Sequence, residues 1–126
     1  RARGPLVVYG TLPDERHGLG LEMTALVLAA AGCRTLYLGT DVPVRQLALL
    51  ARDLQARAVA ISVSRASRGR LSASPLRRLR DSLPRRVRLV VGGEGAPAPR
   101  DGIEVVTSLR ALDIWGRRLA LALTSE

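Results

Sequence analysis

The single histidine of the sequence, His17, lies in a polar loop with an acid two residues before it and a glycine three residues after it. A neutral imidazole that binds a metal ion through one ring nitrogen needs a hydrogen-bond partner on the other nitrogen, and a nearby carboxylate is a common partner. Glu15 is placed to be that partner. Gly20 has no Cβ, so a bulky group could approach the backbone where the loop turns into a helix. The spacing would suit a metal ligand, but a lone histidine in a polar loop is more often a solvated side chain, so these residues alone do not indicate a metal site.

Two further short motifs follow apolar runs that are typical of strands. Ser62-Val63-Ser64 ends one run and Gly92-Gly93 directly follows another. A serine after a strand is often a cap of a turn or helix, and Gly-Gly is usually a turn. Neither motif therefore indicates a ligand site by itself. Whether they belong to one site depends on where the fold places them relative to each other and to His17.

Apolar runs alternate with helical patterns along the chain. The sequence predicts strands at Leu6–Tyr9, Arg34–Leu38, Ala58–Val63, Val87–Val91 and Gly102–Val106. It predicts helices over Leu19–Ala31, Pro43–Leu54 and Pro75–Leu83, with a polar loop at 67–74 before the third, and a last helix from Ser108 or Asp113 to around Leu121. The side chains expected to be buried on the second and last helices are Val44, Leu47, Leu50, Ala51 and Leu54, and Leu109, Leu112, Trp115, Leu119 and Ala122.

This alternation predicts an α/β domain with a five-stranded parallel sheet and helices on both faces. The most economical strand order is flavodoxin-like, 2-1-3-4-5. In such a sheet, ligands bind at the carboxyl ends of the strands, near the switch point between the first and third strands. The His17 loop, Ser62–Ser64 and Gly92-Gly93 all fall at this edge. They are therefore expected to form one site.

Composition limits the remaining possibilities. A chain of 126 residues is large enough for one core, and its one cysteine, Cys33, excludes an internal disulfide and is expected to be a small buried residue. No apolar run reaches the roughly 18 residues of a membrane span, so the sequence predicts a soluble, cytoplasmic protein with no membrane partner. The net charge is +9, and all twenty basic residues are arginine. Many lie in residues 65–88, where a solvated helix face is favoured over a phosphate-binding surface.

The segment Glu15–Gly20 resembles the Asp-x-His-x-x-Gly fingerprint of cobalamin-binding domains, with Glu in the first place, and Ser62–Ser64 and Gly92-Gly93 match two further parts of that pattern. The resemblance is closest to the cobalamin (vitamin B12)-binding domains of MerR-type light-responsive transcriptional regulators, in Glu15–Met23 and in the Tyr-Leu-Gly-x-Asp-x-Pro segment Tyr37–Pro43. The likeness covers nearly the whole chain. It implies that residues 1–126 form a single cobalamin-binding domain from a longer protein.

The resemblance also implies how the residues would be used. In a base-off, His-on mode, His17 would be the lower axial ligand of cobalt and Glu15 would orient it. Gly20 would let the corrin sit close, Ser62 would hydrogen-bond the buried nucleotide tail, and Gly92-Gly93 would leave room for that tail. Many family members have Leu where this chain has Ser64, which leaves the tail packing open. The full set of residues expected to bind the cofactor is Leu12, Glu15, Arg16, His17, Gly18, Gly20, Ser62, Ser64, Gly92 and Gly93.

Three functions remain open. The chain has no acid, base or nucleophile beyond the Glu15–His17 pair, so a binding and sensing domain is favoured over an enzyme. The resemblance favours the sensor domain of a MerR-type regulator that binds adenosylcobalamin or methylcobalamin, contacts DNA only through a separate N-terminal domain and forms a homo-oligomer. The alternatives are a corrinoid carrier domain of a methyltransferase or mutase, and a cofactor-free association module. Walker A and dinucleotide-binding motifs are missing, and a receiver domain would need a lysine that this chain lacks.

Overall fold

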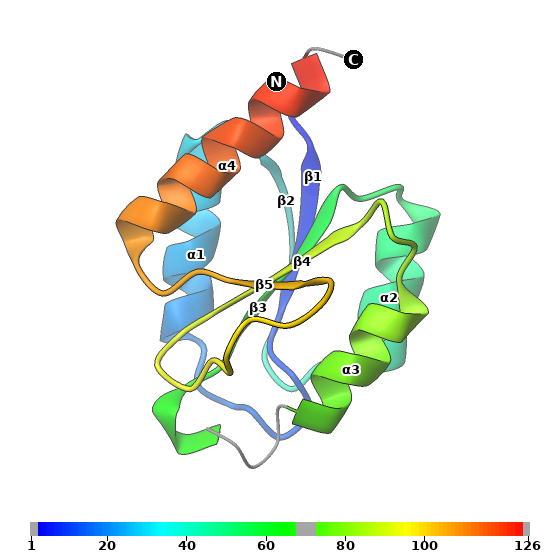
Figure 1. Ribbon diagram of the computed structural model, residues 1–126, viewed down its shortest axis with the longest axis vertical. Coiled ribbons are helices and arrows are strands. Elements are labelled where there is room, and N and C mark those ends of the chain that lie inside the picture. Colours follow the sequence, from blue (N-terminus) through cyan, green and yellow to red (C-terminus); the bar gives the residue numbers. More distant parts are fainter. Residues whose placement is uncertain (1–2, 68–72, 125–126) are drawn as a thin grey trace.

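A computed structural model of the chain describes residues 3–67 and 73–124, and five parallel strands form one sheet in the order β2-β1-β3-β4-β5. Helices lie on both faces of the sheet (Figure 1). The predicted fold class and strand order are therefore confirmed. The strands are β1 (Leu6–Gly10), β2 (Arg34–Gly39), β3 (Ala58–Ser62), β4 (Arg88–Gly92) and β5 (Ile103–Val105), and the helices are α1 (Leu19–Ala30), α2 (Val44–Asp53), α3 (Ala73–Ser82) and α4 (Leu109–Thr124), with a short 3₁₀ helix at Arg65–Ser67.

Most of the polar loop predicted at 67–74 lies outside the described residues. Within residues 3–67 and 73–124, no helix combines the length and hydrophobicity that a membrane span requires.

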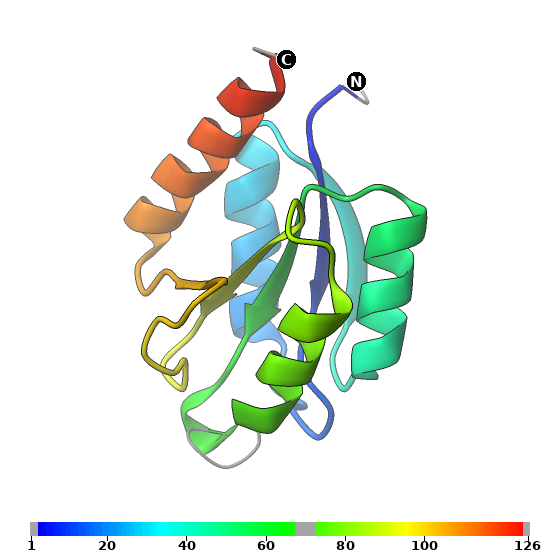
Figure 2. The same ribbon diagram turned by 45° about the vertical axis from the view of Figure 1, so that its right-hand side comes forward.

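The sheet separates two cores. Side chains alternate between the faces along a strand, so Val7 and Tyr9 of β1 pack with α1 and α4, whereas Val8 packs with α2 and α3. Figure 2 shows these two helix pairs on opposite sides of the sheet. All five residues of the central strand β3 are buried. This burial on both faces explains why the run is continuously apolar up to its last residue, Ser62.

Ser108 caps the last helix, which begins at Leu109, because its Oγ accepts a hydrogen bond of 3.1 Å from the backbone N–H of Ala111. This contact decides between the two predicted caps, because a side-chain oxygen at the N-cap satisfies a backbone donor of the first turn. Leu112, Trp115 and Leu119 are buried as predicted, but Leu109 and Ala122 are exposed. Leu109 is the first residue of α4.

Helix α2 is shorter than predicted. It ends at Asp53, so Leu54 lies beyond the helix, is not part of its buried face and is exposed. Leu50 is partly buried, and Ala48 takes the place beside Leu47 in the core. Two buried alanines on this helix, Ala48 and Ala51, let α2 lie close to the sheet.

Helices α1 and α4 also approach each other closely. A Cβ on Gly116 of α4 would lie 2.6 Å from Cδ2 of Leu28 and 3.1 Å from Cβ of Ala31. Cys33 is 7% exposed in the same region, as predicted for a small buried side chain. Glycine at position 116 therefore sets the distance between the two helices on this face.

Two arginines are part of the framework. Arg80 on α3 is buried and donates hydrogen bonds to the backbone oxygens of Leu83, Pro84 and Gly102. Arg88 on β4 makes two hydrogen bonds of 2.8 and 2.6 Å to the carboxylate of Glu104 on β5, and its guanidinium lies 5.0 Å from the ring centre of Trp115. These residues join the edge strand β5 to α3, β4 and α4.

Candidate functional site

The loop between β1 and α1 holds Glu15 and His17 against the end of β3. Oε2 of Glu15 lies 2.9 Å from Nδ1 of His17 and accepts a hydrogen bond of 3.2 Å from the His17 backbone N–H. The backbone N–H of Ser64 donates to Oε1 at 2.7 Å, and the Ser64 hydroxyl donates to Oε2 at 3.1 Å. The Glu15 side chain is 3% exposed whereas that of His17 is 68% exposed. A buried carboxylate thus orients an imidazole that faces outward.

Glu15 is ionised in this arrangement. Burial of its side chain opposes ionisation, but the hydrogen bonds from Ser64 and His17 outweigh it and lower the pKa of Glu15 from 4.5 to about 2. An ionised carboxylate accepts the Nδ1–H of the imidazole, which leaves the lone pair on Nε2. Among the described residues, Nε2 has no hydrogen-bond partner. An imidazole held in this tautomer keeps a ring nitrogen that could bind a metal ion.

Thr11 and Asp41 fix the backbone of this loop. The Thr11 hydroxyl donates to the carbonyl of Glu15 at 2.7 Å and accepts from the backbone N–H of Asp41 at 2.8 Å. The carboxylate of Asp41 accepts from the backbone N–H of Asp14 at 2.7 Å. Asp14 and Asp41 both have positive φ, 71° and 56°, a conformation that Asp tolerates better than most residues. The Tyr37–Pro43 segment therefore anchors the loop that carries His17.

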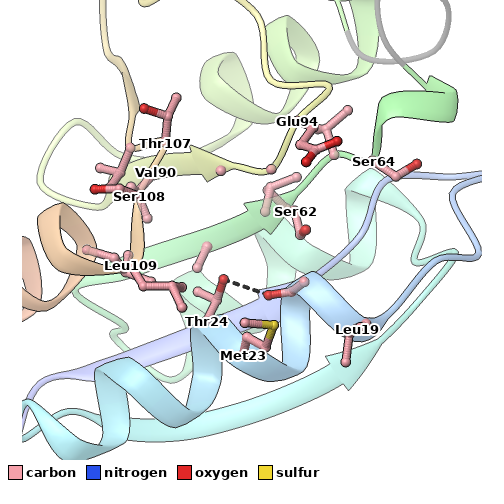
Figure 3. Close-up of a pocket in the computed structure, with 18 of the residues that line it drawn as sticks. Leu19, Met23, Thr24, Ser62, Ser64, Val90, Glu94, Thr107, Ser108 and Leu109 are labelled. Atoms are coloured by element: carbon pink, nitrogen blue, oxygen red, sulfur yellow. Dashed lines mark hydrogen bonds between the residues drawn. The ribbon is translucent and has the colours of Figure 1, made fainter.

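A pocket of about 450 Å³ lies beside His17. Figure 3 shows it between α1, the carboxyl ends of β3 and β4, and the segment that leads into α4. Its lining is mainly apolar, with hydroxyl groups from Thr24, Ser62, Ser64, Thr107 and Ser108. The three sequence motifs therefore meet at one site, because His17, Gly20, Ser62, Ser64, Gly92 and Gly93 all line this pocket.

The glycines of the site are required by the protein's own packing. A Cβ on Gly20 would lie 2.8 Å from Oγ of Ser62, so glycine lets α1 approach the end of β3. A Cβ on Gly92 would lie 3.0 Å from the carbonyl oxygen of Val106. Gly93 has a φ of +100°, and its Cβ would overlap the backbone of Val63. All three also line the pocket, so the same substitutions would change its shape.

Four of the ten predicted residues are not among those that line the pocket. Glu15 is one of them, and it acts on the site through its hydrogen bonds with His17 and Ser64. Leu12 is buried in the core on the α2 and α3 face of the sheet. Arg16 is exposed, and Gly18 is the N-cap of α1, where its Cβ would lie 3.1 Å from Cγ2 of Thr40. The structure therefore gives Leu12 and Gly18 a place in the framework, and brings neither these two nor Arg16 into the lining.

Sequence analysis missed several residues of this site. Thr24 lies one helical turn after Gly20, on the same face of α1, and its hydroxyl donates to the carbonyl of Gly20 at 2.9 Å (Figure 3). That spacing could have identified it. Thr107 follows the carboxyl end of β5, where the rule of strand ends also predicts lining residues. At the rim, Arg65 and Glu94 form an ion pair of 2.8 Å between the segments that follow β3 and β4.

The donor set fits a metal ion that already has other ligands. In the described part of the chain, no group of three or more His, Cys, Asp or Glu side chains is placed to hold a metal ion. One imidazole is sufficient for a metal centre within a macrocycle, where the protein has only to supply an axial ligand, as histidine does for haem iron. An oriented imidazole beside a largely apolar pocket of this size therefore suits a large metal-containing cofactor with an extended substituent.

The fold and site together define a flavodoxin-like domain with a ligand site at the carboxyl edge of its sheet. A family model described as the B12 binding domain matches residues 5–108. The chain therefore belongs to the B12-binding domain family and is a cobalamin-binding domain. No curated protein sequence matches it.

Several solved structures share the fold. The chain is similar to the methanol:cobalamin methyltransferase complex of Methanosarcina barkeri (TM-score 0.75, 16% identity, covering 95% of this chain and 48% of that one). It is similar to the monomethylamine corrinoid protein of the same organism (TM-score 0.65, 18% identity, covering 97% and 58%). It is also similar to a cobalamin-binding protein of Desulfitobacterium hafniense DCB-2 (TM-score 0.61, 21% identity, covering 96% and 59%). The chain thus spans about half to three-fifths of the length of these relatives.

Proposed function

We propose that this domain binds cobalamin in the base-off, His-on mode, with His17 as the lower axial ligand of cobalt. The observation that carries the proposal is the Glu15–His17 pair at the mouth of the pocket, with both oxygens of Glu15 held by Ser64. The exposed ring of His17 is free to meet a flat macrocycle, and the pocket of about 450 Å³ can take a nucleotide tail.

Each part of the site has a separate task in this proposal. Glu15 holds the proton on Nδ1 of His17 and keeps the ring oriented, and Thr11 holds the carbonyl of Glu15. Ser62 and Thr24 provide hydroxyl groups inside the pocket. Bound cobalamin supplies a reactive cobalt–carbon bond. The ionisable side chains that line the described part of the pocket are His17, Arg65 and Glu94, with the last two paired to each other, so we assign this domain a binding role without catalysis of its own.

For the physiological role, we propose the sensor domain of a MerR-type transcriptional regulator. The Tyr37–Pro43 segment, which carries part of that resemblance, has a defined task here because Asp41 anchors the loop of His17. Such a sensor would hold adenosylcobalamin or methylcobalamin, and a change of upper ligand would alter the association of copies and DNA binding by a separate domain.

A corrinoid carrier domain of a methyltransferase or mutase is the second candidate. The observation that favours it is the similarity to a corrinoid protein and to a methyltransferase complex, although at 16–18% identity this similarity shows the fold alone. The same histidine and pocket would serve a carrier, so the two candidates differ in what the upper face of the cofactor meets.

The first test is an absorption spectrum of the purified protein after incubation with hydroxocobalamin and desalting. We expect a base-off, His-on spectrum in the wild type and its loss in His17→Ala, with Arg118→Ala, an exposed change on α4, as the control. Unchanged affinity and spectrum in His17→Ala would refute the assignment of the ligand. Size-exclusion chromatography of the adenosylcobalamin-loaded protein in the dark and after illumination then separates the candidates: a light-dependent change in the association of copies supports the sensor, and photolysis without such a change supports the carrier.

A further inference from the structure

A second concave surface lies on the opposite face of the sheet, in the groove between α2 and α3. Figure 2 shows these two helices side by side at the front of the molecule. The groove has a volume of about 590 Å³. The lining residues that decide what it can bind are Val44, Arg45, Ala48, Leu49 and Arg52 of α2 and Arg78 of α3.

The charged lining of this groove is entirely basic. Arg45 and Arg52 are exposed on α2, and Arg78 is exposed on α3, where its Nη1 lies 3.3 Å from Oγ of Ser74. The acidic residues of the two helices, Asp53 and Asp81, are outside the lining. The three guanidinium groups therefore face the groove without an acidic side chain among its lining residues.

The floor of the groove is apolar. Leu49 is 45% exposed and lies between Arg45 and Arg52 on the same side of α2, and Val44 and Ala48 continue the apolar surface below it. The two arginines are seven residues apart, which is two helical turns or about 10 Å along the axis. A second helix laid in the groove would present side chains with the same spacing at positions i and i+7.

We propose that this groove binds an acidic amphipathic helix of a partner protein. Carboxylates two turns apart would pair with Arg45 and Arg52, a third would meet Arg78, and an apolar side chain between them would cover Leu49. Guanidinium groups form the geometrically specific, two-pronged pairs with carboxylates that such recognition needs. The partner would also touch Pro13, which belongs to the loop that carries His17.

The observations disfavour the other occupants. A second copy of the chain would have to supply the acidic helix, but each of the four described α-helices carries a single acidic residue. The phosphates of a nucleic acid would also pair with these arginines. However, the lining contains no aromatic side chain on which bases could stack, and the apolar floor of Val44, Ala48 and Leu49 would make no favourable contact with a phosphate backbone.

The test measures binding of a designed, fluorescently labelled helical peptide by anisotropy at low and at high salt. The peptide has glutamates at i and i+7 and leucines between them, and a second peptide has the same composition in scrambled order. The protein is used without added cobalamin, so the result does not depend on the proposed cofactor function. Arg45→Glu/Arg52→Glu and Leu49→Ser are the test variants. Arg110→Glu/Arg118→Glu makes the same charge change on exposed positions of α4 and is the matched control.

We expect Arg45→Glu/Arg52→Glu to bind the ordered peptide about tenfold more weakly, the loss expected when two exposed ion pairs become repulsive. Leu49→Ser should also weaken binding, because it removes the apolar contact between the two arginines. The control variant should bind within about twofold of wild type by the same scale. High salt should weaken binding of the ordered peptide without abolishing it, because the contact with Leu49 is apolar. Circular dichroism checks that each variant is folded.

Four results would overturn the proposal. Equal weakening in the groove and control variants would mean that only the net charge of the protein matters. Equal binding of the scrambled peptide, or no binding of the ordered one, would mean that the groove does not recognise a helix. Tighter binding of duplex DNA than of the peptide, with the same sensitivity to Arg45→Glu/Arg52→Glu, would identify a nucleic-acid surface.

Discussion

Ser64 holds both oxygens of Glu15. Its backbone N–H donates to Oε1 at 2.7 Å and its hydroxyl donates to Oε2 at 3.1 Å, although the two residues are 49 positions apart in the chain. The hydroxyl also lies 3.4 Å from Nδ1 of His17. The serine that departs from the leucine of related domains is therefore part of the structure that orients the proposed ligand.

A first prediction follows for Ser64→Ala. The variant keeps the backbone donor but loses the hydroxyl, so we expect cobalamin affinity to fall roughly two- to tenfold, the range expected for one hydrogen bond. Spectroscopic titration measures it, with Ser82→Ala on α3 as a control that should leave affinity unchanged. Equal affinities for all three proteins would show that the hydroxyl does not orient His17.

The low pKa of Glu15 predicts a pH-dependent contribution to stability. Its pKa is about 2 in the folded protein against 4.5 for an ordinary glutamate. Because the folded-state value is lowered, the stabilisation is fully present above the unfolded-state pKa and is lost as pH falls from about 5 toward about 2. The full effect is on the order of 3 kcal/mol by linkage.

Denaturant unfolding of the wild type and Glu15→Gln across that range checks this prediction. Above about pH 6 the wild type should be the more stable protein by a constant amount. Below pH 4.5 the difference in the free energy of unfolding should shrink. A difference that stays the same down to pH 2.5 would mean that Glu15 is not the group that titrates.

The shape of the pocket can be tested from α1. Thr24 points into the pocket, whereas Leu26 on the same helix is 72% exposed and lies outside the lining. Thr24→Phe should fill the space proposed for the nucleotide tail and weaken cobalamin binding by about tenfold or more, the cost expected for overfilling a packed site. Leu26→Phe adds a phenyl ring to the same helix and should have no effect. Similar binding by both variants would place the tail elsewhere.

A fourth prediction concerns the edge of the sheet. Glu104 accepts two hydrogen bonds from Arg88 and one of 3.2 Å from Nε1 of Trp115, and the hydrogen bonds of these partners lower the pKa of Glu104 although burial opposes ionisation. Glu104→Ala removes the shared acceptor and should reduce the free energy of unfolding by about 1–2 kcal/mol, because the site is half-exposed.

The matched control is Asp113→Ala. It removes an exposed i,i+4 pair with Arg117 on α4, and we expect a loss of about 0.5 kcal/mol or less. Thermal or denaturant unfolding measures both variants. If Asp113→Ala costs as much as Glu104→Ala, the cluster around Trp115 has no special role in holding β5.

The sheet and the edge at which the site lies were predictable, because apolar runs, glycines and prolines follow local rules. The run Ala58–Ser62 is apolar throughout since both faces are covered, and Gly93 needs a positive φ. The roles of Thr11 and Asp41 were not predictable, since the hydrogen bonds that fix the His17 loop join segments about 30 residues apart. Leu12 was assigned to the site because it lies next to the His17 loop in the sequence. Its side chain instead packs in the core on the opposite face of the sheet.

The sequence contains no lysine, and its arginines differ in whether lysine could replace them. Arg80 is one that lysine could not replace. Its planar guanidinium reaches the backbone carbonyls of Leu83, Pro84 and Gly102 at once. The compact ammonium group of a lysine could not reach all three. An exposed arginine such as Arg118 has no such requirement. A lysine placed there would be the sole side-chain amine of the sequence. Amine-reactive chemistry at a pH above the α-amine range, or on a chain with a blocked N-terminus, could then attach a probe or a surface at one chosen point of α4.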